Sequence, residues 1–452
     1  MSAVVTDKFR FTNAENFKAD TVAAGNSYYL FIGRSQQWAD DLNAPQPSSN
    51  TYDQRNAWEN LQALKILTDG DTSHCVPRYD WVPSTYAFAE FNDRDDELYT
   101  KRFYCMTDEF NVYICLKSGA GVSVTKPTGQ STESFQTVPN DGYTWKYLFT
   151  VTAADSVKFM TNSYIPVKRF TEDELLNGLP DGSPYEPQRQ ISLAAVDGAI
   201  NHMVISDGGT NYAQATTTVV IEGNGVGATA EVFETGGVIT DITITDIGSG
   251  YTYARAVITD SANGVGATAY PIIAPPGGHG FDPAKELGGY LITANIKLEQ
   301  ADGDGDFTVG NDYRQLGILK NPFDFGTTTV SSEITLNALK EFTFALGSDS
   351  GIQNDELIVG QSSGAVAMVD KYIATNGPDA GTLRYHQDET TGYTPFVLET
   401  ILGSTSSGAA TIATLTNPEV ETFSGDIIFL ENRSPINRAA DQTESIKLVI
   451  EF

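Results

Sequence analysis

Short apolar runs separated by polar turns mark the first part of the chain. The run YYLFI at 28–32, closed by Gly33, predicts a buried strand, and 112–116 predicts a second one. In 143–151, aromatic residues alternate with mostly polar ones after an Asp-Gly turn, which predicts a strand with one aromatic face. Ordinary core packing accounts for such a face, and an interface is the alternative.

Two short helices are also predicted. Within 56–67, Trp58, Leu61 and Leu64 are spaced three apart, as on one face of an amphipathic helix. Further along, Thr171 and Glu174 have capping-box spacing, so a helix should begin there. This second helix is expected to end near Gly178.

Glycine clusters between Val, Ile and Thr strands mark the region after 190 and contain an internal repeat. Residues 207–230 align without gaps to 246–269, and NGVGATA is identical in both copies. A unit this small cannot bury its own apolar face, so the two copies should pack on each other. A weaker pair, 360–369 and 406–415, predicts a second small β module.

These patterns predict an α+β, β-rich multidomain protein: a mixed α/β body with inserted glycine-rich β modules. Residues 180–190 look like a linker, rich in Pro and turn formers. The alternation of Ile446, Leu448, Ile450 and Phe452 predicts a final strand tied into a sheet. The expected segments are an N-terminal body (1–188), a tandem-repeat module (189–275), the body continued (276–345), a second β module (346–420) and returning C-terminal strands (421–452).

The charge of the chain narrows the range of partners. The 452 residues include 58 Asp and Glu against 28 Lys and Arg, a formal net charge of −30. Such a surface repels phosphate backbones and anionic lipids, so neither nucleic acid nor a membrane is an expected partner. No secretion signal, no apolar run of about 20 residues and no paired cysteine motif is present, which favours a soluble protein made in a reducing cytosol. Cys75, Cys105 and Cys115 are expected to be small buried hydrophobes.

Motifs that could carry chemistry are weak. GQSSG at 360–364 fits a nucleophile elbow, but a strand pattern follows it where the elbow needs a helix. DGDGDF at 302–307 fails as an EF-hand loop, which leaves an acidic turn with weak cation binding as a minor alternative. The acidic run at 92–97 is interpreted as a solvated loop. The four histidines are far apart, and backbone fitting is the favoured role for His279 in its glycine loop. The residues thus predict a non-enzymatic interaction protein with no catalytic, metal or cofactor site and no small-molecule substrate.

Five segments, in order, resemble the baseplate wedge subunit encoded by gene eight in T-even-type contractile-tailed phages. They are YYLFIGRSQQW (28–38), AWENLQALKIL (57–67), VPRYDW (76–81), DGYTWKYLF (141–149) and NSYIPV (162–167). The residues that carry the resemblance are Gly33, Arg34, Trp38, Trp58, Pro77, Arg78, Asp80, Trp81, Asp141, Gly142, Tyr143, Trp145, Tyr147, Leu148, Phe149 and Tyr164. Their role, structural or interfacial, is left unassigned. Arg34 and Arg78 have local carboxylates such as Asp40 and Asp80 as alternative partners.

The resemblance implies a late structural protein of the virion with a two-domain α/β body and a tendency to dimerise. It implies contacts with other wedge subunits of the same phage, a role in baseplate assembly, and a rearrangement that triggers sheath contraction. It implies no catalysis. Two alternatives stay open: an adhesin that displays the glycine repeats to a receptor, and a hydrolase using Ser362 with His386 as base.

Overall fold

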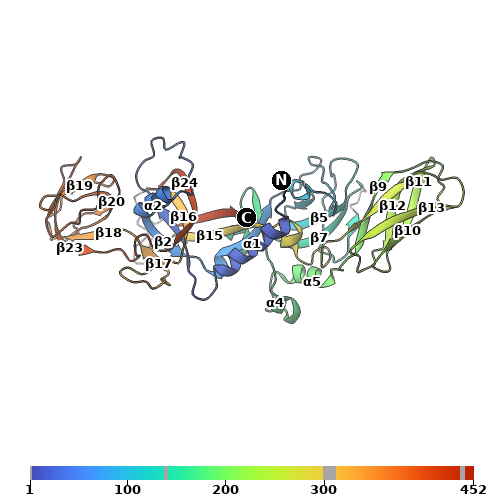
Figure 1. The fold of residues 1–452 in the computed structure, drawn as a ribbon, viewed down its shortest axis with the longest axis horizontal. Helices are drawn as coiled ribbons and strands as arrows, with labels where there is room; N and C mark the ends of the chain where they lie inside the picture. The colour runs from blue at the N-terminus through green and yellow to red at the C-terminus, as the bar shows by residue number, and fades with distance from the viewer. Residues whose placement is uncertain (1–2, 137–140, 299–311, 438–442) are drawn as a thin grey trace. The chain divides into compact units, whose positions relative to one another are not determined.

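The computed structural model describes residues 3–136, 141–298, 312–437 and 443–452. The chain divides into two compact units, residues 1–15, 73–293 and 449–452 in unit 1, and residues 16–72 and 294–448 in unit 2. Antiparallel strands dominate both units, so the predicted β-rich multidomain fold is confirmed (Figure 1). The five-segment division is finer than these units and stays a prediction. No helix of the described residues has the length and apolarity needed to cross a membrane.

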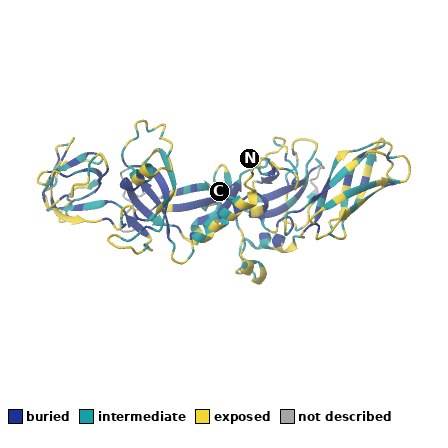
Figure 2. Ribbon diagram, viewed as in Figure 1, coloured by how far each residue is buried: buried dark blue, intermediate teal, exposed yellow. Residues whose placement is uncertain are grey.

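A four-stranded sheet forms the centre of unit 1. Its order is β4 (Tyr104–Met106), β5 (Asn111–Lys117), β7 (Thr144–Thr150) and β6 (Phe135–Gln136). Successive residues of β5 point to opposite faces and enter two separate cores, which explains its unbroken apolar run. The strands of this sheet are largely coloured as buried in Figure 2. The strands predicted at 112–116 and 143–151 are confirmed.

Short elements surround this sheet. Strand β3 (Thr72–Pro77) pairs with β8 (Tyr164–Val167). The helices are α3 (Ala153–Lys158), α4 (Glu172–Asn177), α5 (Glu186–Ala194) and α6 (Pro283–Glu286), with a 3-10 turn at Leu98–Thr100. The Thr171–Glu174 capping box and the end of α4 at Gly178 are both as predicted.

The rest of unit 1 includes the repeat module, residues 200–273. Its strands are β9 (Ile200–Asp207), β10 (Thr217–Gly223), β11 (Thr229–Thr235), β12 (Val238–Asp246), β13 (Ala254–Asp260) and β14 (Thr268–Ile273). The pairs are β10–β13, β11–β12 and β14–β9, so every pair joins one repeat copy to the other. The prediction that the copies pack on each other is confirmed.

Unit 2 contains a five-stranded sheet and a closed barrel. The sheet order is β17 (Thr335–Asn337), β2 (Leu61–Ile66), β1 (Tyr28–Gly33), β16 (Asp312–Lys320) and β24 (Asp426–Asn437). Along the chain, helix α2 (Thr51–Glu59) lies between β1 and β2, and a 3-10 turn at Asp69–Asp71 follows β2. The barrel module, residues 340–416, has the closed order β18 (Lys340–Phe344), β21 (Thr382–His386), β20 (Val366–Ile373), β19 (Leu357–Gly360), β22 (Thr400–Gly403) and β23 (Ala409–Thr416).

Three elements run along the chain from one unit into the other. They are α1 (Asp7–Asp20), β15 (Leu291–Leu298) and β25 (Glu444–Glu451). The predicted C-terminal strand is confirmed, because β25 is an edge strand of a four-stranded sheet and buries both Ile446 and Leu448.

Two local predictions were wrong. The helix expected over 56–67 ends at Glu59, and 61–66 is strand β2, which pairs with β1 on one side and β17 on the other. Sheet pairing therefore overrides the three-residue apolar spacing. The linker expected at 180–190 contains the start of α5, since Pro187 falls in the first turn, where a helix tolerates proline.

Candidate functional site

The residues that carry the family resemblance divide between the two units. Gly33, Arg34, Trp38 and Trp58 belong to unit 2, and Pro77, Arg78, Asp80, Trp81, Asp141, Gly142, Tyr143, Trp145, Tyr147, Leu148, Phe149 and Tyr164 belong to unit 1. All of them are buried or half-buried. Within each unit they support the fold, and none is an exposed side chain ready to meet a partner.

Asp141 organises the loop that faces it in unit 1. Its Oδ2 atom accepts hydrogen bonds from the backbone N–H of Val124 at 3.0 Å and of Thr125 at 3.3 Å. It also accepts from the hydroxyl of Ser123 at 3.3 Å, and Ser123 Oγ in turn accepts from Trp81 Nε1 at 3.0 Å. One carboxylate thus links the DGY motif to the VPRYDW motif.

The two residues after Asp141 explain the rest of the DGY motif. Gly142 has a φ of +88°, and a Cβ there would lie 3.1 Å from the Cα of Gly119. The fully buried Tyr143 stacks on Trp145 with ring centroids 5.5 Å apart, and its hydroxyl accepts the N–H of Phe88 at 3.1 Å. The predicted aromatic face of 143–151 is therefore core.

The two motif arginines behave differently. Arg78 Nε donates to Asp80 Oδ1 at 2.8 Å, the local pairing expected from the sequence. Arg34 instead stacks its guanidinium over the Trp38 ring, 3.9 Å from the centroid. Trp38 is fixed by its indole N–H, which donates to the carbonyl of Arg433 at 2.9 Å. Both arginines therefore take part in structural contacts within their own unit.

A buried polar network in unit 2 joins the residues after β1 to the barrel module. Ser35 Oγ donates to Asp370 Oδ1 at 2.9 Å, and the other oxygen of Asp370 lies 2.5 Å from His386 Nδ1. His386 Nε2 lies 3.0 Å from the side-chain amide of Gln36. Burial alone would lower the pKa of His386, but the charge and hydrogen bond of Asp370 raise that pKa overall.

The network continues through Arg314. Its guanidinium binds both carboxylate oxygens of Asp41 at 2.9 Å and lies 2.9 Å from Asp312. A third nitrogen donates to the backbone carbonyl of Ser35. Burial, helped by the charges of Asp312 and Asp370, raises the pKa of the nearby Asp355 to about 6.

The network contains Ser, His and Asp but does not form a catalytic triad. In a triad the serine hydroxyl donates to histidine, which acts as its base. Here Ser35 donates to the carboxylate, and both nitrogens of His386 have other partners. Ser362 lies in the β19–β20 turn with its N–H donating to Glu399 at 2.6 Å, and strand β20 follows where an elbow needs a helix. The geometry therefore gives no support to the hydrolase alternative.

The other titratable groups serve the fold as well. His279 pairs with Glu286, Nδ1 to Oε1 at 2.5 Å. Beyond the expected fit of its backbone in the glycine loop, its side chain therefore contributes a buried polar contact. Cys75, Cys105 and Cys115 are free and buried, as predicted. Among the described residues, no cluster of His, Cys, Asp or Glu could hold a metal ion. The acidic turn at 302–307 lies outside the described residues.

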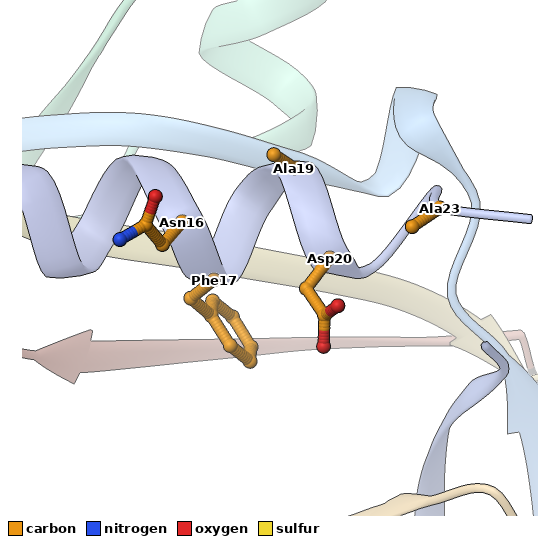
Figure 3. A pocket seen from close by; sticks show the side chains of 5 residues that line it. All are labelled: Asn16, Phe17, Ala19, Asp20 and Ala23. Carbon is orange, nitrogen blue, oxygen red and sulfur yellow. The ribbon is translucent and has the colours of Figure 1, made fainter.

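A shallow pocket of about 470 Å³ lies along α1 (Figure 3). Its lining residues are Asn16, Phe17, Ala19, Asp20 and Ala23. The carboxylate of Asp20 already binds Lys320 at 2.5 Å, and that hydrogen bond is the main reason that the pKa of Asp20 is lowered. The pocket therefore offers a ligand only the ring of Phe17 and the carboxylate of Asp20, which is already ion-paired with Lys320. These groups are a poor basis for a ligand site.

Comparison with known proteins shows a distant similarity to a phage protein. Over 205 aligned residues the chain is 25% identical to the baseplate wedge protein gp8 of Enterobacteria phage T4, a match that covers 36% of this chain and 60% of that protein. The chain is thus distantly similar to a phage baseplate wedge protein. It spans less than two thirds of that relative's length. The sequence matches no protein-family model.

Proposed function

We propose that this chain is a structural protein of a contractile-tail phage baseplate wedge. It bridges neighbouring wedge proteins during baseplate assembly and takes part in the rearrangement that triggers sheath contraction. The observation that carries the proposal is the similarity to a wedge protein, together with the ordered motifs whose residues form the framework of each unit. The protein acts through its surfaces and not through bond chemistry.

The proposal includes partners and location. The protein forms a homodimer, binds other wedge subunits of the same phage and resides in the tail baseplate of the virion after assembly in the host cytoplasm. The strongly acidic composition supports partners that present basic surfaces and argues against nucleic acid.

Mass spectrometry of purified phage particles tests the location, and a density map of the tail end tests the role. We expect the chain in stoichiometric amounts, in contact with at least one different wedge protein. Its absence from purified particles would overturn the proposal. Sedimentation of the isolated chain should show a dimer, and a strict monomer at every concentration would contradict the homodimer.

A further inference from the structure

The repeat module is built around an approximate internal two-fold axis. Equivalent residues of the two copies are 39 positions apart, and the β10–β13 register places Val219 opposite its own equivalent, Ile258. The tyrosines that follow the first strand of each copy make matching contacts. Tyr212 Oη accepts the N–H of Ala267 at 3.1 Å, and Tyr251 Oη accepts that of Ala228 at 3.4 Å. The module therefore has two equivalent sides.

The barrel module of unit 2 has the same plan. The β18–β21 register pairs Glu341 with Arg384, and the β19–β22 register pairs Val359 with Leu402, both 43 positions apart. When the strands of each module are numbered along the chain from one to six, neighbouring strands follow the closed order 2-5-6-1-4-3 in both. Both modules are thus internally duplicated versions of one six-stranded arrangement, although their repeats differ in sequence.

One side of the repeat module already serves as a docking face within unit 1. The outward side chains of the β9–β14 pair, Val204, Tyr270 and Ile272, pack against the core beside the central sheet. Arg94 lies over the Tyr270 ring, 4.2 Å from its centroid. Lys117 also pairs with Asp241 at 2.7 Å on the neighbouring strand β12, where Asp241 stands opposite Phe233 in the β11–β12 register. The docking chemistry is therefore an apolar patch met mainly by cations, with one carboxylate, Glu90, 3.3 Å from Nε2 of His202 on β9.

The barrel module contacts the rest of unit 2 through a strand pair that is equivalent to the docked β9–β14 pair. Ser35 binds Asp370 on β20, and Gln36 contacts His386 on β21. β20 and β21 are the third and fourth strands of the barrel module. The internal two-fold relates strands three and four to strands six and one, which in the repeat module are the docked strands β14 and β9. The main contacts of each module with the rest of its unit therefore fall on one member of a symmetric set of strand pairs.

The symmetry equivalent of the β9–β14 face is exposed at three positions, beside Asp241, which Lys117 already binds. The residues 39 positions from Val204, Tyr270 and Ile272 are Thr243, Glu231 and Phe233 on the β11–β12 pair, and all three are exposed. Phe233 keeps 38% of its surface in solvent, whereas its inward neighbour Val232 keeps 5%. An aromatic side chain beside a carboxylate at mid-strand is suited to an interface centre.

We propose that this β11–β12 face is a second docking surface and that its occupant is a basic surface of a different protein in the same assembly. The partner places Lys or Arg against Glu231 and an apolar side chain against Phe233, as Arg94 and the unit 1 core do on the equivalent face. The Arg and Lys side chains that meet the repeat module within unit 1 favour a basic partner at Glu231, and the homodimer proposed above uses a different surface. The inference rests on the proposed function, which supplies the assembly.

Site-specific photocross-linking in intact particles tests the surface directly. Phage are grown with p-benzoylphenylalanine in place of Phe233, and the matched control carries it in place of Val220, which is 53% exposed on β10 of the same module. Irradiated particles are purified and the cross-linked peptides identified. We expect a cross-link from position 233 to a Lys- or Arg-rich surface of another virion protein, and none from position 220.

Three results would overturn the inference: a cross-link from 233 to another copy of this chain, a cross-link to an acidic surface, or none in particles that contain the chain. Particles that lack the chain would overturn the proposed function itself, which separates the two failures. As a second measurement, Glu231→Lys should lower the yield of the 233 cross-link about tenfold, since charge reversal opposes a basic partner. Thr218→Lys on exposed β10 is the control, and an equal loss there would contradict the proposal.

Discussion

At position 142 both the backbone conformation and the neighbouring Gly119 exclude a side chain, which is why glycine occupies it. A φ of +88° strains any L-residue, and a Cβ would lie 3.1 Å from the Cα of Gly119. Gly142→Ala should therefore cost about 2 kcal/mol of unfolding free energy, measured by urea titration. Gly182→Ala is the control, because its φ is +76° but nothing lies within 4 Å of its Cβ position. It should cost about 1 kcal/mol. If both substitutions lowered the free energy of unfolding by the same amount, the close approach of Gly119 would contribute nothing to the cost at position 142.

Two glutamates hold the turns of the barrel module in a reciprocal way. Glu356 accepts hydrogen bonds from the Ser406 side chain and the turn that contains it, and Glu399 does the same for Ser363. Burial acts to raise the pKa of each carboxyl, but the bonds from Ser406 and Ser363, with the turn N–H groups, lower both pKa values overall.

The lowered pKa values of Glu356 and Glu399 determine how stability depends on pH. A folded pKa below the unfolded value of about 4.3 means that the stabilisation is complete above pH 4.3 and is lost as the pH falls through the folded pKa. Glu356→Gln should cost about 2 kcal/mol at pH 7 and flatten the acid limb of stability, measured by urea unfolding between pH 7 and about pH 3. Glu389→Gln, on the exposed surface, is the control. An unchanged acid limb in Glu356→Gln would contradict the account.

At the scale of elements, the equivalent residues Tyr212 and Tyr251 each fill the space beside a glycine of the other copy, Gly264 and Gly225 respectively. Tyr251 is 4% exposed, and a Cβ on Gly225 would lie 2.4 Å from its ring. Tyr251→Ala should destabilise the repeat module by about 3 kcal/mol and speed amide hydrogen exchange in β10 to β13. Tyr253→Ala is the neighbouring control, because Tyr253 is 66% exposed, and it should change stability by less than about 0.5 kcal/mol. Similar exchange in both variants would contradict the packing role.

Local sequence patterns were sufficient for elements that a short spacing or an internal sequence identity signals. The capping box of α4, the aromatic strand β7 and the pairing of the repeat copies all rest on short-range spacing or identity. Strand β2 was mistaken for helix because its place between β1 and β17 is decided by residues far along the chain. The Ser35, Asp370 and His386 network was missed for the same reason, since 335 residues separate Ser35 from Asp370 and no local motif signals it.

At the scale of the whole molecule, the charge of −30 gives opposite salt dependences to two kinds of association. Identical chains repel each other, so added salt should strengthen self-association by screening that repulsion. Binding to a basic partner is an attraction, so the same salt should weaken it. Raising the salt from 0.1 M to 1 M shortens the Debye length from about 10 Å to about 3 Å, which is enough to expose both effects.

Sedimentation velocity of the full chain at the two salt concentrations therefore distinguishes the proposed contacts. We expect the dimer fraction of the isolated chain to rise with salt, while complexes with the partner identified at position 233 dissociate more readily. The charge-reversed Glu231→Lys chain should show a smaller salt effect on the partner complex and an unchanged one on the dimer, because the β11–β12 face is assigned to the partner alone. If both associations responded to salt in the same direction, the separation of a basic-partner surface from the self-association surface would be wrong.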